Sequence, residues 1–268
     1  MKIDDFIGSL TRRGSLSKAS ENTKRAYRVS LLKFESFLNG QKVRVALAQE
    51  FILQEMQDGL KPASVCRDGW ALKRYLAWVG FPEKAIRNVR LPSVIEQLPD
   101  YHEKEELDLL LKVAKTPLER ALVIVLTDTV LRISELRALT NERVDWKGGY
   151  IFTDREKTGM PGWIPISPQA LAALTEYVKW AKIPKSPKAK LFPMSYNDYY
   201  KWIRGLGERA GIKSHPHKFR HTGIALRHFD GVEISTLKDL AGHKKYDTTM
   251  RYAGLKSRAL KEKIKPVL

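Results

Sequence analysis

The first eighty residues alternate apolar and polar positions with the period of amphipathic helices. In residues 19–40, aromatic and leucine side chains recur every three or four positions after a start rich in capping residues, and the pattern ends at a glycine. Residues 45–59 and 61–80 repeat the pattern, the latter with a proline near its start. The spacing predicts an N-terminal helical domain over residues 1–82.

The periodicity then weakens. Residues 81–102 contain three prolines and no sustained apolar repeat. Basic residues are interspersed along this segment. We therefore expect a basic interdomain linker over residues 83–101.

Helical periodicity returns in the second half of the chain. Residues 103–115 and 117–130 predict helices, and the second is apolar enough to be buried. Residues 149–153 and 162–167 have the composition of short strands and flank a polar turn, which is typical of a β-hairpin. Most later segments are again helical. The fold class is mainly α with a small β-hairpin (α+β), and residues 102–268 form the second domain.

The charge of the chain suggests its partner. The net charge is +18, with 17 Lys and Arg against 11 Asp and Glu in residues 1–100 and 31 against 19 in residues 101–268. Excess positive charge in both halves attracts polyanions over a long surface, and nucleic acid is the expected one. A basic protein without a polyanionic partner, or one that meets acidic membranes, is the alternative.

Composition excludes several classes of protein. No apolar run is long enough to span a bilayer, and the first ten residues carry two acids, unlike a signal peptide. The single cysteine, Cys66, excludes an internal disulfide and a CxxC metal site. We expect a cytoplasmic protein without membrane contact.

The segment HPHKFRHTG, residues 215–223, concentrates imidazole and cationic side chains that could hold a metal ion or a phosphate. Zinc would need further ligands, and the fixed charges of Lys218 and Arg220 disfavour a cation. On a helix, His217, Arg220 and His221 share one face at i, i+3 and i+4. A guanidinium matches phosphate oxygens, and an imidazole can move a proton near neutral pH. We therefore favour a phosphate over a metal ion as the group that this segment binds.

Other candidates follow a fixed order along the chain. TVLRISEL contains Arg132 and Glu135, the predicted hairpin turn contains Lys157, and a GH pair ending at His243 is followed nine residues later by Tyr252. Together with the histidine motif, this succession over residues 102–268 resembles the tyrosine recombinase, or phage integrase, family. The resemblance implies a catalytic domain preceded by a helical core-binding (SAM-like) domain that binds DNA.

The resemblance also implies a reaction. Arg132 and Arg220 hold the oxygens of the scissile phosphate, and Tyr252 attacks phosphorus to give a 3′-phosphotyrosyl intermediate. Lys157 protonates the leaving 5′ oxygen. The linkage conserves the energy of the broken bond, so no metal, cofactor or ATP is expected. A lysine in a turn is, however, often only solvated.

The remaining roles are supporting ones. His217 helps to deprotonate or orient the tyrosine, His243 hydrogen-bonds the phosphate, and Glu135 supports the arginine site. Tyr246 is a rival nucleophile, but its distance from His243 fits the family pattern poorly. Possible phosphate contacts elsewhere, which could equally be plain surface charge, are Lys218, His221, Lys244, Lys245, Arg67, Lys73 and Arg74.

Three positions depart from the family pattern. Val130 stands where glycine is usual, Ala241 where leucine is commoner, and Gly223 where a bulkier residue is frequent. None of these changes removes a catalytic group.

The expected assembly is a homotetramer on two sites of double-stranded DNA, joined by a C-terminal helix that docks on a neighbouring subunit. That helix could instead pack on its own domain. A site-specific recombinase (integration, excision or resolution), associated with the nucleoid through DNA, is the preferred function. A type IB topoisomerase-like enzyme and a catalytically idle DNA-binding protein remain the alternatives.

Overall fold

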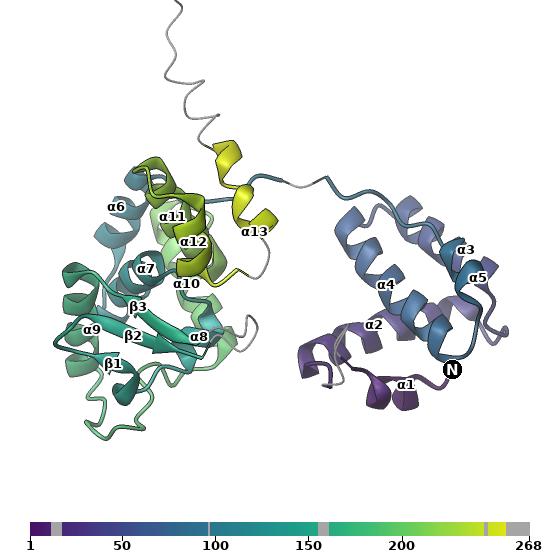
Figure 1. The fold of residues 1–268 in the computed structure, drawn as a ribbon, viewed down its shortest axis with the longest axis horizontal. Coiled ribbons are helices and arrows are strands. Elements are labelled where there is room, and N and C mark those ends of the chain that lie inside the picture. Colours follow the sequence, from purple (N-terminus) through teal and green to yellow (C-terminus); the bar gives the residue numbers. More distant parts are fainter. Residues whose placement is uncertain (12–17, 96, 155–160, 244–245, 256–268) are drawn as a thin grey trace, which may run out of the picture. The chain divides into compact units, whose positions relative to one another are not determined.

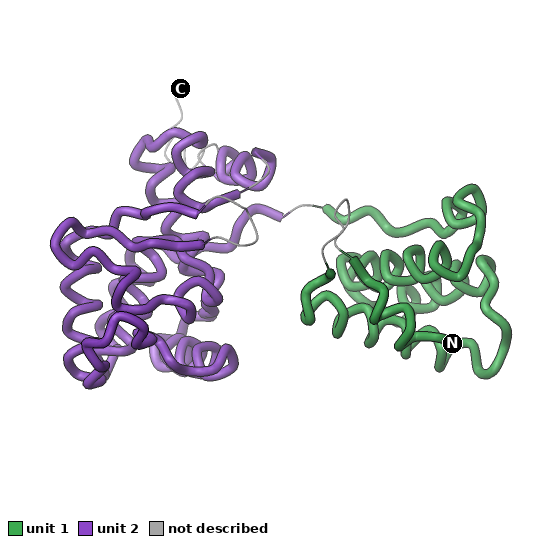
Figure 2. Tube along the Cα trace, turned by 60° about the horizontal axis from the view of Figure 1, so that its bottom comes forward, with its two compact units in different colours: residues 1–96 green, residues 97–268 purple. Residues whose placement is uncertain are grey.

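The computed structural model describes residues 1–11, 18–95, 97–154, 161–243 and 246–255. It divides into two compact units, Met1–Glu96 and Gln97–Leu268 (Figure 2). The expected fold class is confirmed, because the chain is mainly helical with a small antiparallel sheet (Figure 1). None of the described helices is both long and apolar enough to cross a membrane.

Unit 1 is a helical bundle. Its helices α2, α3 and α4 pack against one another, α1 packs on α2, and α5 packs on α4. Their apolar faces enclose one core that contains Leu31, Phe34 and Leu72. The helices are α1 (Ile3–Ser9), α2 (Glu21–Leu38), α3 (Val45–Gln57), α4 (Pro62–Trp78) and α5 (Glu83–Arg87).

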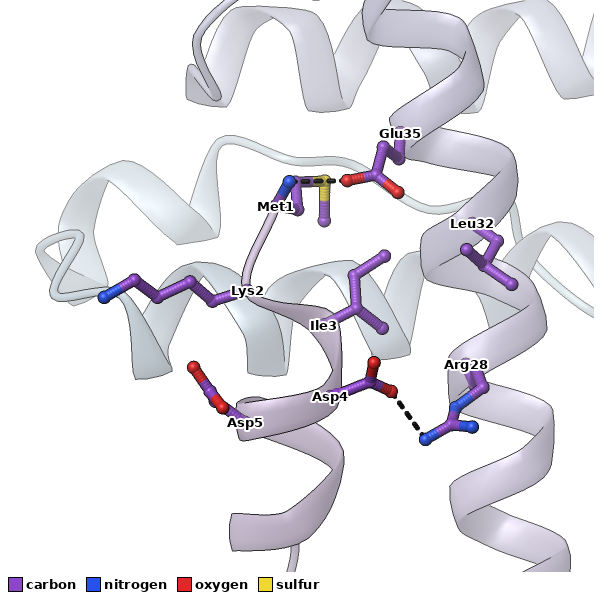
Figure 3. Close-up of a pocket in the computed structure, with 8 residues that line it drawn as sticks. All are labelled: Met1, Lys2, Ile3, Asp4, Asp5, Arg28, Leu32 and Glu35. Carbon is purple, nitrogen blue, oxygen red and sulfur yellow. Dashed lines mark hydrogen bonds and ion pairs between the residues drawn. The ribbon is translucent and has the colours of Figure 1, made fainter.

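Two ion pairs hold α1 on α2. Asp4 contacts Arg28 at 2.7 Å, and the α-amino group of Met1 contacts Glu35 at 2.5 Å. Figure 3 shows both pairs at the edge of a hollow between the two helices. The apolar side of α1 lies beneath them, with Phe6 packed edge-on against the ring of Tyr75 in α4.

Part of the segment predicted as a linker, residues 83–101, belongs to unit 1. Helix α5 occupies its first residues, and Ile86 and Val89 are buried in the core of unit 1. The unit boundary falls after Glu96. The sequence pattern concealed α5 because a five-residue helix is too short to show a period.

Unit 2 is built around α7, which packs against α6, α9, α10 and α11. Its helices are α6 (Lys104–Val113), α7 (Pro117–Thr129), α8 (Ile133–Arg137), the 3₁₀ turn η1 (Asn141–Arg143), α9 (Pro168–Trp180), α10 (Tyr196–Ala210), α11 (Pro216–Phe229), α12 (Ile234–Ala241) and α13 (Tyr246–Met250). Side-chain caps begin several of these helices: Thr116, Ser167 and Ser195 each accept a hydrogen bond from a backbone N–H of the first turn.

The predicted hairpin is present as two strands of a three-stranded antiparallel sheet. The strands are β1 (Val144–Asp145), β2 (Tyr150–Thr153) and β3 (Gly162–Pro165), in the order β1-β2-β3. Ile151 pairs with both Val144 and Ile164, so one face of the sheet is apolar and buried. The sequence did not predict β1, because two residues are too few to show alternation.

His102, at the start of the predicted second domain, is fully buried in unit 2. Its backbone N–H donates to Thr222 at 2.8 Å, and its ring contacts Ser214 at 3.0 Å and Glu106 at 3.3 Å. The residue therefore ties the entry of unit 2 to α6 and α11. Burial, assisted by the charge of Lys218, lowers the pKa of His102 to about 4.

We expect the stability of unit 2 to fall in acid because of His102. The unfolded chain protonates this histidine near pH 6.5, whereas the folded protein does so near pH 4. Between these values the unfolded state binds more protons, so the free energy of unfolding falls as pH falls, by up to about 3 kcal/mol. Urea unfolding at pH 7, 5 and 4 should show a smaller loss in His102→Gln. If the wild type and His102→Gln lost the same free energy of unfolding, His102 would not be the cause of the acid sensitivity.

Val130 ends α7 in the left-handed backbone region, with φ 47°. This conformation favours glycine and strains a β-branched residue. The family's usual glycine at this position therefore has a backbone reason. The valine side chain is retained in a buried cluster, where it contributes apolar contacts.

Substitution at Val130 should reverse the usual order of alanine and glycine. Both variants lose the buried side chain, but only glycine relieves the left-handed strain. We expect Val130→Gly to exceed Val130→Ala in free energy of unfolding by about 1 kcal/mol. Urea denaturation of the two variants measures the difference. A more stable alanine variant would show that the strain is relaxed elsewhere.

Candidate active site

Helix α11 carries the histidine motif. It begins where Pro216 occupies the first turn and the Nδ1 of His215 accepts the Lys218 N–H at 3.2 Å. The helical spacing predicted for this segment is present, and the rings of His217 and His221 meet at 4.4 Å between centroids. Among the described residues, no group of three or more His, Cys, Asp or Glu is arranged to hold a metal ion.

Arg220 lies at the junction of three helices and is only 2% exposed. Its Nη1 donates to the carbonyl of Val130 at the end of α7, and its Nη2 donates to the carbonyl of Ala241 at the end of α12, at 2.5 Å. Two carbonyl dipoles thus offset the burial of the guanidinium charge. The side chain is fixed before any substrate arrives.

Arg132 reaches the same end of α12 from another direction. Its Nη2 donates to the carbonyl of Gly242 at 3.4 Å, next to the carbonyl that binds Arg220. Glu135 holds it in place, accepting from its Nη1 at 2.7 Å and from its backbone N–H at 2.8 Å. The structure therefore brings the two arginines to adjacent carbonyls, with Glu135 beside Arg132.

Tyr252 follows α13 and is 1% exposed. It belongs to a small core, here called the tyrosine cluster, that is separate from the main core of unit 2. The cluster consists of Val130, Ile224, Ala225, Leu237, Ala241, Tyr252 and Leu255. Burial raises the pKa of Tyr252 well above its usual value, an effect only partly offset by Arg220 and Arg251.

The hydroxyl of Tyr252 is hydrogen-bonded to the Nδ1 of His221, one helical turn beyond His217. The sequence analysis paired the tyrosine with His217, whereas in the structure the hydroxyl contacts His221. Spacing alone could not distinguish them, because both histidines lie on one face of α11. The choice depends on how α11 is rotated against the segment after α13, which is set by packing.

The two histidines have depressed pKa values. Burial lowers the pKa of His221 to about 3, with contributions from His217 and Arg220. Burial of part of its ring, followed by the charge of Arg220, lowers the pKa of His217 to about 4, although this side chain keeps an exposed surface. Both rings are therefore neutral at physiological pH.

His243 lies directly after α12, beside Gly242. Its Nδ1 contacts the hydroxyl of Thr249 in α13 at 2.9 Å. A hollow of about 700 Å³ opens next to it, lined by β3 and by α12 residues. Trp163 of β3 is exposed at this hollow, so the His243 side of the site is accessible to a large ligand.

Several predicted residues are placed differently or not described. Lys218 is buried: its Nζ donates to the carbonyl of Lys213 at 3.3 Å and pairs with Asp100 at 3.3 Å. Lys157, Lys244, Lys245 and the tail from residue 256 lie outside the described residues. The rival nucleophile Tyr246 is 49% exposed, at the start of α13.

The cations predicted to face DNA in unit 1 lie on α4. The ammonium of Lys73 sits over the ring of Trp70 at 5.7 Å. Arg74 is largely engaged inside the unit, stacking over Tyr27 at 6.0 Å and donating to the carbonyl of Thr11 at 3.1 Å. Lys73 is thus the better placed of the two for a surface contact.

Arg67 also lies on α4 and belongs to a charged network that the sequence did not reveal. Its Nε donates to the buried carboxylate of Asp68 at 2.8 Å, which Lys33 and Ser30 also contact at 2.7 and 2.6 Å. Burial opposes ionisation of Asp68, but hydrogen bonds from Arg67, Lys33 and Ser30 outweigh it and lower the pKa to about 2. The neighbouring Glu55 behaves oppositely, because burial and the nearby Asp68 raise its pKa to about 7.

Sequence comparison places the chain among known proteins. The model of the phage integrase family matches residues 101–258, more than half of the chain. The chain is 28% identical to the tyrosine recombinase XerA of Pyrococcus furiosus, over 98% of this chain and 92% of the relative. It is 27% identical to the tyrosine recombinase XerD of Pseudomonas aeruginosa, over 93% and 91%.

Solved structures with the same fold cover nearly the whole chain. The Tn1549 transposon integrase in complex with transposon right end DNA matches with a TM-score of 0.73 at 19% identity, over 98% of this chain and 99% of that one. A lambda integrase tetramer bound to a Holliday junction matches with a TM-score of 0.72 at 17% identity, over 93% and 75%. At these identities the likeness concerns the fold. The family match over most of unit 2 is decisive: the chain belongs to the phage integrase family and is a tyrosine recombinase, an enzyme that cleaves and rejoins DNA strands.

Proposed function

We propose that this site cleaves a DNA strand with Tyr252 as the nucleophile. The observation that supports the proposal most is the meeting of Arg132 and Arg220 at adjacent carbonyls of α12, with the Arg220 helix also supplying the partner of Tyr252. Two guanidinium groups can bind the non-bridging oxygens of one phosphate and stabilise the charge that develops there. A nucleophile beside such a clamp suits phosphoryl transfer.

The proposed step is balanced in bonds and protons. The Tyr252 oxygen forms a bond to phosphorus and the bond to the 5′ oxygen breaks, which leaves a 3′-phosphotyrosyl linkage. The leaving oxygen takes a proton from Lys157, the general acid in this scheme, while the tyrosine proton passes to a neighbouring base. A 5′-hydroxyl from the same or another strand then attacks the linkage and releases Tyr252. His217 and His243 complete the phosphate-binding surface.

The partner in this proposal is double-stranded DNA, and the assembly is a homotetramer on two sites. The net charge of +18 and the family relationship support the DNA partner. The lambda integrase neighbour, a tetramer on a Holliday junction, supports the assembly. Arg67, which is exposed, and the half-buried Lys73 of unit 1, with Lys244 and Lys245, are the proposed phosphate contacts, so affinity should fall steeply with salt. Through this DNA the protein would be associated with the nucleoid.

The test is covalent capture in EDTA. Nicked duplexes are first selected for binding from a fragment pool, then incubated with the protein and resolved on a denaturing gel. The modified peptide is identified by mass spectrometry. An adduct at Tyr252 supports the proposal, whereas an adduct at Tyr246 would overturn the choice of nucleophile. Salt-sensitive binding with no adduct would favour an idle DNA-binding protein, and strand exchange between paired sites distinguishes a recombinase from a type IB topoisomerase.

A further inference from the structure

The Tyr252 hydroxyl presents a solvation problem. Its ring is 1% exposed and packs in the tyrosine cluster, whose other members are all apolar. A buried hydroxyl without a partner costs about 1–3 kcal/mol. The bond to His221 removes this cost, so the histidine decides whether the buried position of the nucleophile is stable.

The charges around His221 determine the direction of that bond. Arg220 and His217 on α11, Arg251 next to Tyr252, and His215 at the start of α11 all lie near its ring. These neighbours and burial disfavour the imidazolium, so the ring is neutral. Tyr252 is neutral as well, and the other members of the tyrosine cluster are apolar, so we assign its O–H as the donor and Nδ1 as the acceptor. The proton of the imidazole is then on Nε2.

We propose that His221 is the positioning residue of the nucleophile, whose Nδ1 accepts the hydrogen bond of the Tyr252 hydroxyl and holds that hydroxyl within the tyrosine cluster while no DNA is bound. The importance of this contact for strand cleavage rests on the proposed function. The contact itself is a property of the DNA-free protein. In this closed state the phenol is neutral and shielded, and cleavage requires the cluster to open or rearrange when a phosphate enters.

His217 cannot substitute for His221 in this role. It lies one turn earlier on α11, and its ring meets the edge of the His221 ring rather than the tyrosine. The rings of His221 and Tyr252 lie 5.9 Å apart between centroids. The ring nitrogen that reaches the Tyr252 hydroxyl is therefore that of His221.

The test compares His221→Asn with His221→Leu in the absence of DNA. Asparagine places an acceptor oxygen near the position of Nδ1, whereas leucine has similar bulk and no acceptor. Each protein is treated with N-acetylimidazole, which acetylates accessible phenols, and acetylation is followed by peptide mass spectrometry. Tyr246, 49% exposed and six residues earlier, serves as the internal reference.

We expect Tyr252 to react slowly in the wild-type protein and in His221→Asn. In His221→Leu its rate relative to Tyr246 should rise on the order of tenfold, the factor that corresponds to one lost hydrogen bond. Equal protection in the two variants would show that burial alone holds the tyrosine, and it would overturn the proposal. Loss of protection in both variants would also contradict it, provided that both unfold at the wild-type temperature.

A second measurement needs no variant of His221. The ring ¹⁵N shifts of His221 in the labelled DNA-free protein should show an unprotonated Nδ1, and that signal should move in Tyr252→Phe. A proton on Nδ1 of the wild-type ring would overturn the proposal, even if the leucine variant fails to fold. The covalent-capture assay on the wild type tests the proposed function separately. If that assay fails while Tyr252 shows the expected protection pattern, the proposed strand cleavage is wrong. The contact between Tyr252 and His221 is then still established.

Discussion

Tyr252→Phe is expected to abolish the covalent protein–DNA adduct while leaving the affinity for DNA within about twofold. Phenylalanine retains the ring that fills the tyrosine cluster, so α11, α12 and α13 keep their packing. The substitution removes only the attacking oxygen, for which no other group substitutes in the proposed chemistry. Binding rests on phosphate contacts that the ring does not make, so it should be preserved.

The Tyr252→Phe substitution should cost the folded state little stability. The variant gives up the hydrogen bond between the hydroxyl and His221, which lowers the free energy of unfolding by about 1 kcal/mol. Adduct formation is measured on nicked duplexes in EDTA, and affinity by filter binding over a salt series. Tyr246→Phe is the matched control and should form the adduct at the wild-type rate. A Tyr252→Phe protein that still forms an adduct would exclude Tyr252 as the nucleophile.

Gly223→Ala should damage both the fold and the site. A Cβ at this position would lie 1.9 Å from the carbonyl oxygen of Thr127 and 2.7 Å from Cγ1 of Val130. The first contact is with the backbone of α7, so no change of rotamer relieves it and α11 must move away from α7. We expect the free energy of unfolding to fall by about 3 kcal/mol. Arg220 and His221 lie on the same helix and should be displaced with it. The yield of the covalent adduct should therefore fall.

Gly205→Ala provides the control for Gly223→Ala. Gly205 lies within α10, where an added Cβ meets only the end of the Arg209 side chain at 3.9 Å. Alanine is the better helix former there, so this variant should gain about 0.5–1 kcal/mol. Urea unfolding of the two variants should therefore give opposite signs. A neutral Gly223→Ala would mean that α7 and α11 can separate at little cost.

The sequence predicted those parts of the fold that depend on local chemistry. Apolar spacing and capping residues located most of the helices, including α11 with its motif. The strands β2 and β3 followed from their composition and from the polar turn between them. Short elements escaped prediction, since α5 and β1 are too brief to show a period.

For the candidate site, the sequence predicted the residues better than it predicted their contacts. The order of the motifs selected Arg132, Arg220 and Tyr252, which the structure places in one region of unit 2. The sequence could not show that His221 meets the tyrosine or that Lys218 is buried. Both facts depend on the rotation of α11 against segments distant in the chain, and that rotation is set by packing rather than by local preference.

The close approach at Gly223 links two departures from the family pattern. Glycine is usual at position 130 and a bulkier residue is frequent at 223, whereas this chain has Val130 and Gly223. The valine methyl occupies part of the space that a side chain at 223 would need. A side chain at position 223 would therefore need both the α7 backbone at Thr127 and the side chain of Val130 to move. Anyone who builds a chimeric recombinase from this chain should therefore transfer α7 and α11 together, because either helix alone would bring a mismatched partner.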